Sequence, residues 1–302
     1  MSMPTELIAA AYTPMNADGS LNLDAVGPMA EHCIATDVDG VFIAGSTGEC
    51  HSLTLSERLA LNERWADVAR GGELQVISHV GSHSQPDAIE LARQSGELGL
   101  TAISAVAPSY FKPATVADLV AFMKPIAAAA GDLPFYYYHI PPMTGLMLPL
   151  PEIVKAFRDE VPSYAGYKYS SLDLETLQRA QSVDPTAKVF YGSDQVLMAA
   201  WVLGVRAAVG STYNFAAPLY RRILDACERG DFETARHEQA LSVRMVDIMQ
   251  RTGFLGTSKL LMKHLGVDCG AVRAPLTNID EAVLAPMIRE LEAMDVLAPA
   301  FR

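Results

Sequence analysis

One lysine and several hydroxyl-bearing residues follow short apolar runs that are typical of β-strands. Lys168 lies in the run Ala165–Ser171, among aromatic and small residues. Burial would disfavour the charged form of such a lysine, and a neutral amine can attack a carbonyl carbon. A lysine at a strand end can also be a surface residue whose stem packs while its charge stays in water. By itself, Lys168 is therefore compatible with a Schiff-base nucleophile or with a surface residue.

Two further groups at strand ends meet the needs of chemistry at a carbonyl group. The segment Gly45–Glu49 (GSTGE) offers two hydroxyls and accessible backbone N–H groups, which suit a carboxylate or phosphate. It is equally compatible with a glycine-rich tight turn, and it lacks the GK[ST] ending of a Walker loop. Tyr138 ends another apolar run, where its phenol can pass protons to a bound oxygen or simply pack in the core.

Three other loops carry aromatic or polar side chains after apolar runs. Residues 108–113 form an aromatic segment between two prolines. Residues 192–195 (GSDQ) and 210–214 (GSTYN) carry small hydroxyls, a carboxylate and amides. Such groups suit recognition of a polyol, because each can donate or accept a hydrogen bond.

Other catalytic patterns are not supported by the sequence. His79 and His83 flank a glycine-containing loop and no HExxH helix accompanies them, so a metal site is disfavoured. The segment 45–48 is not a GxSxG nucleophile elbow. Asp37 and Asp39 precede an apolar run, and we expect them to be solvated at the rim opposite the active site.

The charge and cysteine content exclude several classes of protein. The 302 residues carry a net charge of −12 and show no Lys/Arg run, which argues against nucleic acid as a partner. The four cysteines are far apart without a CxxC pair, so we expect free thiols: Cys33, Cys50, Cys227 and Cys269. No signal peptide and no apolar stretch of the roughly 18 residues of a membrane span is recognised. We therefore expect a cytoplasmic protein that does not bind a membrane.

Apolar runs of strand length alternate with helical patterns up to about residue 230. Strands are expected at residues 7–11, 40–44, 75–80, 102–106, 134–138, 164–169, 189–191 and 207–209. Helices are expected at residues 23–36, 54–69, 85–98, 116–130, 150–159, 172–181, 196–203 and 218–229. Eight such pairs predict an α/β fold, a (β/α)8 TIM barrel. An open doubly wound sheet is the alternative, and the absence of a GxGxxG motif disfavours it.

Beyond residue 230 only helical patterns remain, at residues 232–251, 257–265 and 279–297. We expect residues 1–230 to form the barrel that carries the active site. Residues 231–302 would then be a C-terminal helical subdomain. In a barrel of this kind the chemistry lies where strands end and βα loops begin, so the polar loops above would share one rim.

Four motifs, in order along the chain, resemble the class I pyruvate-dependent aldolases. This is the N-acetylneuraminate lyase and dihydrodipicolinate synthase superfamily, and the motifs are residues 45–49, 136–141, 167–170 and 210–214. The similarity extends over nearly the whole chain, including the helical C-terminus. Within the superfamily, YYYHIP and GSTYN resemble the N-acetylneuraminate lyases, particularly their animal-type branch.

The resemblance implies catalytic roles for Lys168, Tyr138 and Ser46. Lys168 would form an imine with the 2-keto group of the substrate, so that neither a metal nor an organic cofactor is expected. Tyr138 would move the proton between the C4 hydroxyl and the carboxylate region as the C3–C4 bond breaks. Ser46, Thr47 and their backbone N–H groups would hold the carboxylate.

The resemblance also implies a homotetramer in which Tyr110 reaches a neighbouring subunit's site. The residues expected to line the sugar chain are Ser170, Gly192, Asp194, Gln195 and Ser211.

The implied activity is reversible cleavage of N-acetylneuraminate, a sialic acid, to N-acetylmannosamine and pyruvate. The lyase pattern usually has an aromatic or apolar residue followed by Asp-Glu after the strand-seven glycine, whereas this chain has Ser193, Asp194 and Gln195. A related 2-keto-3-deoxy sugar acid aldolase or dehydratase is therefore the alternative. Met143 stands where dihydrodipicolinate synthases carry an Arg, which argues against that activity. A non-catalytic 2-oxo-acid-binding protein is a third hypothesis, from a different class.

Overall fold

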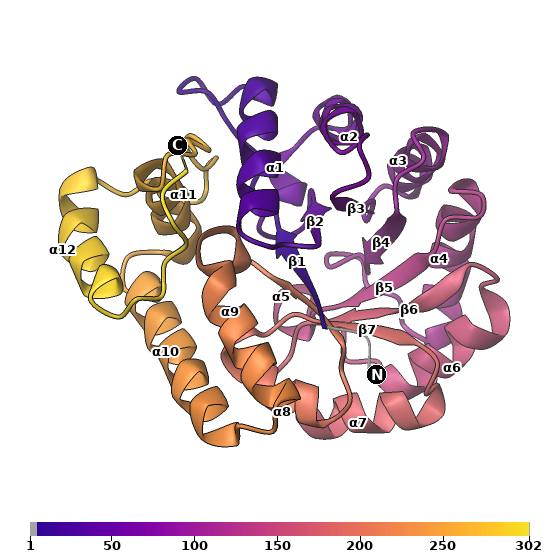
Figure 1. Ribbon diagram of the computed structural model, residues 1–302. Coiled ribbons are helices and arrows are strands. Elements are labelled where there is room, and N and C mark those ends of the chain that lie inside the picture. The colour runs from indigo at the N-terminus through magenta and orange to yellow at the C-terminus, as the bar shows by residue number, and fades with distance from the viewer. Residues whose placement is uncertain (1–4, 302) are drawn as a thin grey trace.

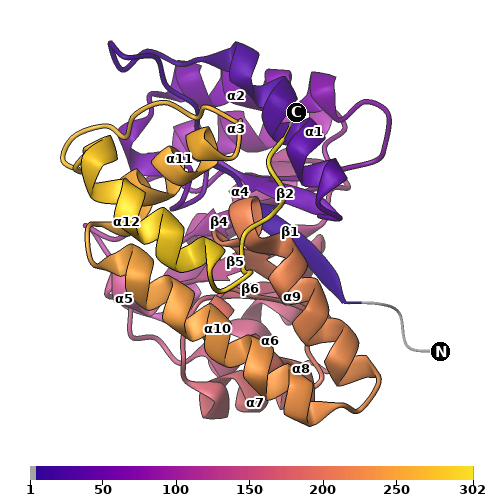
Figure 2. The same ribbon diagram turned by 60° about the vertical axis from the view of Figure 1, so that its left-hand side comes forward.

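Eight parallel strands close into a barrel in the order in which they occur along the chain. The computed structural model describes residues 5–301. Figures 1 and 2 show the barrel with its helices arranged around it. The strands are β1 (Glu6–Ala10), β2 (Gly40–Ile43), β3 (Gln75–His79), β4 (Ala102–Val106), β5 (Phe135–His139), β6 (Tyr164–Tyr169), β7 (Lys188–Tyr191) and β8 (Ala207–Gly210). The (β/α)8 prediction is confirmed.

Helices follow the strands and cover the outside of the barrel (Figure 1). They are α1 (Val26–Ala35), α2 (Leu55–Val68), α3 (Gln85–Glu97), α4 (Val116–Ala129), α6 (Leu150–Glu160), α7 (Leu174–Val183), α8 (Leu197–Val202) and α9 (Tyr213–Glu228). A short helix, α5 (Pro141–Thr144), and the 3₁₀ turns η1 (Leu23–Ala25), η2 (Cys50–Ser52) and η3 (Asp194–Val196) lie in the loops. A capping box formed by Thr54 and Glu57 starts α2.

Both faces of the barrel sheet are buried, because alternate residues of each strand point inward and outward. Inward side chains form a compact cluster that includes Phe42, Tyr138 and Phe190. Lys168 lies opposite Tyr138 in β5 and opposite Phe190 in β7, so its side chain belongs to the same inner face. Its neighbours Tyr167 and Tyr169 point outward and pack in the layer between strands and helices.

Three further helices follow the barrel: α10 (Phe232–Gln250), α11 (Phe254–His264) and α12 (Glu281–Glu292). Figure 2 shows α10 and α12 side by side against the α9 side of the barrel. Arg244 of α10 and Arg251, which caps the C-terminus of that helix, both bind Glu290 of α12. The last segment returns to the barrel, where the Ala298 N–H donates to the Phe215 carbonyl at 2.6 Å. We propose that residues 231–302 are a helical subdomain of the barrel and not a separate functional domain.

Some predicted helix ends are wrong. The helix expected at 218–229 begins at Tyr213, because a first helical turn precedes Ala216, whose backbone is non-helical (φ −140°, ψ 24°). Pro218 marks only the second segment of α9. The helix expected at 279–297 is shorter, since Asp280 caps its N-terminus by accepting from the Ala282 N–H.

The expectation that Asp37 and Asp39 are solvated holds for Asp37, whose side chain is 84% exposed, whereas Asp39 is only partly exposed. Both carboxylates pair with Arg221 of α9, at 3.1 and 2.7 Å. Asp39 additionally accepts from the Leu7 N–H, and Arg221 donates to the Thr5 carbonyl. This cluster fastens α9 to the N-terminal ends of β1 and β2.

All four cysteines are buried and free, as predicted. Within residues 5–301, none of the helices combines the length and the apolar character that crossing a membrane requires.

Replacing Arg221 should destabilise the barrel. Arg221→Ala removes several hydrogen bonds from a largely buried guanidinium, and we expect the free energy of unfolding to fall by about 2 kcal/mol. The control, Arg179→Ala, removes an exposed pair with Glu175 and should change stability by no more than about 0.5 kcal/mol. Urea titrations followed by circular dichroism measure both. Equal effects of the two changes would contradict the fastening role.

Candidate active site

Lys168 is enclosed by aromatic rings inside the barrel. Lys168 is only 4% exposed. Nζ lies 3.8 Å from the centroid of the Phe42 ring and 4.3 Å from that of Tyr138. No carboxylate among residues 5–301 forms an ion pair with it. Burial lowers the pKa of Lys168 to about 7, although Asp194 and Cys50 oppose the change. A large fraction of the amine is therefore neutral near pH 7, as a nucleophile requires.

Tyr138 is directly beside this amine on the neighbouring strand. Its hydroxyl lies 3.4 Å from the Ser46 Oγ. Burial raises the pKa of Tyr138, while Ser46 and Ser170 lower it. The phenol therefore keeps its proton at neutral pH and can lend it to a reacting oxygen.

The segment 45–49 follows β2 and brings two hydroxyls to the same place. Thr47 Oγ1 lies 2.6 Å from the Ser211 Oγ of the β8 loop. Gly45 is needed for close packing, because a Cβ at this position would lie 2.6 Å from the Phe42 ring. The hydroxyls of Ser46, Thr47 and Ser211 are therefore gathered above the rings that enclose Lys168.

A cavity of about 240 Å³ joins these groups at the mouth of the barrel. Its lining includes every predicted site residue except Tyr110, namely Lys168, Tyr138, Ser46, Thr47, Ser170, Gly192, Asp194, Gln195 and Ser211. They come from loops and strands far apart in the sequence, which meet because parallel strands end at one rim.

Asp194 forms part of the cavity wall and also binds the β8 loop. Its Oδ2 accepts from the Thr212 hydroxyl at 2.6 Å and from the Thr212 N–H at 3.3 Å. Burial raises the pKa of Asp194, and the hydrogen bonds from Thr212 lower it. Thr212 was not singled out from the sequence, although it lies in a motif that was.

Comparison with known proteins places this geometry in a family. A sequence model of the Dihydrodipicolinate synthetase family matches residues 3–294. The chain belongs to this family.

Relatives within the family agree with the resemblance drawn from the motifs. N-acetylneuraminate lyase of Danio rerio is 38% identical over 279 residues, which cover 90% of each chain. Proteus mirabilis N-acetylneuraminate lyase superposes with a TM-score of 0.93 at 34% identity, covering 97% of this chain and 99% of that one. The sialic acid aldolase of Aliivibrio salmonicida has the same TM-score at 32% identity, with 99% of both chains covered. The predicted superfamily is confirmed.

Tyr110 does not line the cavity that the other predicted site residues share. It is 78% exposed and packs edge-on against Phe111, which is also exposed. Its predicted contact with a neighbouring subunit stays a prediction.

The C-terminal helices supply cavity residues that the sequence reading missed. Val246 and Gln250 of α10 and Phe254 of α11 line the mouth. Their helical spacing predicts only an amphipathic helix, and nothing local indicates which face meets the barrel. Gln250 therefore adds an amide to the wall that Gln195 already lines.

One expectation about a polar motif needs correction. Tyr213 and Asn214, grouped with the polyol-binding residues, do not line the cavity. They begin α9, and the Asn214 amide donates to the carbonyls of Ala10 and Ser211. These contacts hold β1 against the β8 loop.

His79 has both ring nitrogens occupied. The Val106 N–H donates to Nε2, so Nδ1 carries the proton and donates to the Ala44 carbonyl at 2.9 Å. Burial holds the pKa of His79 well below its usual value. Across residues 5–301, no group of three or more His, Cys, Asp or Glu side chains is placed to hold a metal ion.

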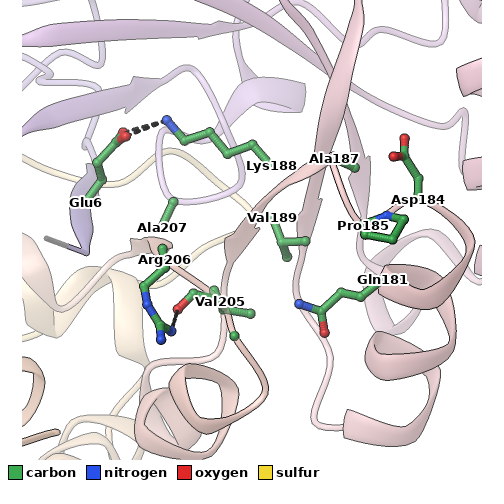
Figure 3. Close-up of a pocket in the computed structure, with 11 residues that line it drawn as sticks. Glu6, Gln181, Asp184, Pro185, Ala187, Lys188, Val189, Val205, Arg206 and Ala207 are labelled. Atoms are coloured by element: carbon green, nitrogen blue, oxygen red, sulfur yellow. Dashed lines mark hydrogen bonds and ion pairs between the residues drawn. The ribbon is translucent and has the colours of Figure 1, made fainter. Parts of the chain in front are cut away.

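A second cavity of about 310 Å³ lies at the opposite end of the barrel (Figure 3). Its lysine, Lys188, forms an ion pair with Glu6 at 2.6 Å, and Arg206 donates to the carbonyls of Trp201 and Val205. An amine held in an ion pair with a carboxylate is poorly placed to attack a carbonyl carbon. The larger cavity therefore lacks the features that distinguish the mouth.

The neutral amine of Lys168 can be tested by competitive labelling. With acetic anhydride as a trace reagent and peptide mass mapping from pH 5.5 to 10, Lys168 should become half-reactive near pH 7. Because the pKa of Lys168 is lowered, labelling of this amine should increase as the pH rises through about 7. Lys155, which is exposed, is labelled in the same samples and serves as the internal control for the reagent. A labelling profile of Lys168 with its midpoint well above pH 7 would contradict the desolvated site.

Proposed function

We propose that this protein is a Schiff-base aldolase, a carbon–carbon lyase that reversibly cleaves N-acetylneuraminate to N-acetylmannosamine and pyruvate. The observation that carries the proposal is the juxtaposition of a desolvated Lys168 and the Tyr138 phenol below a hydroxyl-rich loop. N-acetylneuraminate lyases among its relatives support the choice of substrate.

The first steps use the neutral amine of Lys168. Nζ attacks the C2 keto carbon of the substrate, and loss of water with uptake of one proton leaves a protonated imine. The imine is an electron sink, so the electron pair of the breaking C3–C4 bond moves toward its nitrogen and forms an enamine of pyruvate. No metal or organic cofactor is needed in this scheme, because the covalent imine supplies the sink.

Tyr138 handles the proton that must leave the C4 hydroxyl. As the C3–C4 bond breaks, this oxygen becomes the aldehyde oxygen of N-acetylmannosamine, and its proton passes to the Tyr138 oxygen. The phenol, which lies next to Ser46, at the same time gives its own proton to the substrate carboxylate. The enamine then takes a proton at C3, and water hydrolyses the imine to release pyruvate. Synthesis follows the same steps in reverse.

The carboxylate of the substrate binds at the segment 45–49. Ser46, Thr47 and their N–H groups donate to it, and Ser211 supports Thr47. The glycerol chain then extends along Ser170, Gly192, Asp194, Gln195 and Ser211, toward Gln250. A neutral amide at Gln195 recognises hydroxyls without adding charge.

The same proposal includes assembly into a homotetramer in the cytoplasm. Exposed apolar side chains follow β4 and β5, namely Tyr110, Phe111, Met143 and Met147. Large exposed apolar groups in neighbouring loops are a feature of interaction surfaces. Tyr110 would there contribute to the site of an adjoining subunit.

Reductive trapping tests the activity directly. Incubation with pyruvate and borohydride should add the reduced pyruvyl group to Lys168 alone, as found by peptide mass mapping. Lys168→Ala should lose both the label and cleavage, whereas Lys188→Ala, at the opposite cavity, should keep both. Labelling elsewhere, or of no lysine, would overturn the mechanism and favour a non-catalytic binding protein.

A substrate panel separates the sialic acid aldolase from its relatives. Nine-carbon N-acetylneuraminate should give a higher kcat/KM than six-carbon 2-keto-3-deoxy sugar acids. The reverse order would favour the 2-keto-3-deoxy sugar acid aldolase or dehydratase. Ser193 and Gln195, which differ from the pattern usual in the lyases, are the residues that would then account for the preference.

Tyr138→Phe separates proton transfer from imine formation. Removal of the phenol oxygen should lower kcat by about 10²–10⁴-fold, the usual range for a lost general acid–base group. Trapping of pyruvate on Lys168 should fall far less, since the amine is still desolvated. Equal losses in the two measurements would show that the proton role is misassigned.

A further inference from the structure

The carboxylate-binding loop begins and ends at residues with strained backbone. Ala44 has φ 50° and Glu49 has φ 58°, a left-handed conformation that non-glycine residues rarely adopt. Such residues persist only where the surrounding structure holds them, and they occur preferentially at functional sites. The contacts at each end of the loop therefore decide where the Ser46 and Thr47 hydroxyls lie.

The first end is held from inside the barrel. His79 donates from Nδ1 to the Ala44 carbonyl at 2.9 Å, and its other nitrogen is fixed by the Val106 N–H. Arg58 in turn binds the His79 carbonyl. This support comes from β3, β4 and α2, all within the barrel.

The second end is held by the C-terminal subdomain. Glu49 points away from the active-site cavity, and Lys259 of α11 binds its Oε1 at 2.7 Å. The two side chains are 0% and 1% exposed. The Arg273 N–H donates to the other carboxylate oxygen at 2.8 Å. Both oxygens of Glu49 thus bind groups that come more than 200 residues later in the chain.

All the donors of Lys259 are used in this contact. Besides Glu49, Nζ donates to the carbonyls of Thr13 and Ala271, each at 2.8 Å. The Thr13 hydroxyl donates to the Gly48 carbonyl at 2.7 Å. The ammonium group of Lys259 therefore fixes Glu49 and the backbone at Ala271 directly. It fixes the Gly48 carbonyl indirectly, because it also holds Thr13.

We propose that Lys259 is a positioning residue, which through Glu49 holds the loop of Ser46 and Thr47 in the geometry that binds the substrate carboxylate. The inference rests on the proposed function. Lys259 does not line the cavity, so it acts only through Glu49. A buried ion pair is a poor source of net stability, because desolvation of both charges offsets their attraction. Precise placement of the loop is what this pair provides.

The test compares three full-length variants in the synthetic direction. Lys259→Met removes the ammonium group and keeps the apolar stem. Lys259→Met combined with Glu49→Gln removes both charges, so that no uncompensated buried carboxylate remains. Lys263→Met is the matched control, because Lys263 lies one turn later on α11 in an exposed pair with Glu281.

A positioning role predicts a selective effect on the carboxylate-bearing substrate. The KM for pyruvate, and the pyruvate concentration that half-saturates trapping on Lys168, should rise about 10-fold or more in the single and the double variant. The KM for N-acetylmannosamine should change much less, and Lys263→Met should match the unaltered protein. The double variant should recover most of the thermal stability lost by the single one, without recovering pyruvate affinity.

Two results would overturn the inference. In the first, the double variant recovers both its stability and the pyruvate KM of the unaltered protein. In the second, Lys259→Met leaves the pyruvate KM unchanged. Either result would mean that Lys259 has only a structural role. If Lys259→Met does not fold, the double variant alone decides between these outcomes. Failure of the proposed function is recognised separately, because then pyruvate and borohydride would not label Lys168 in the unaltered protein either.

Discussion

The desolvation of one amine is the constraint on which the rest of the structure depends. Burial lowers the pKa of Lys168 to about 7, so the barrel interior itself sets the protonation state of this lysine. At the other end of the barrel, Lys188 instead forms an ion pair with Glu6. Asp194 acts on Lys168 only at a distance, while its own carboxylate is hydrogen-bonded to Thr212.

Around this amine the molecule separates its tasks between two parts. The barrel supplies the reacting groups on adjacent strands, where backbone pairing fixes Lys168 against Tyr138. The C-terminal helices supply the outer wall of the cavity and the far support of the carboxylate-binding loop. Helices that look like an appendage in the sequence thus line the same cavity as Lys168 and Tyr138.

Much of the fold could be predicted because it follows from local patterns. Apolar runs of strand length gave the eight strands, and the rule that parallel strands end at one rim placed Lys168 near Tyr138. Side-chain partnerships between distant elements could not be predicted in this way. Glu49 reads as the end of a glycine-rich loop and Lys259 as one of several lysines on a helix, and only the folded chain joins them. The start of α9 was misjudged because Pro218 gives the stronger local signal.

The distance along the chain between Glu49 and Lys259 has a consequence for biosynthesis. Glu49 is translated 210 residues before Lys259, its partner in the folded chain. Domains fold as their sequence emerges, so the strands of the barrel can begin to associate before α11 exists. The Glu49 end of the loop therefore acquires its buried ion pair only after α11 has been translated, later than the strands that carry Lys168 and Tyr138.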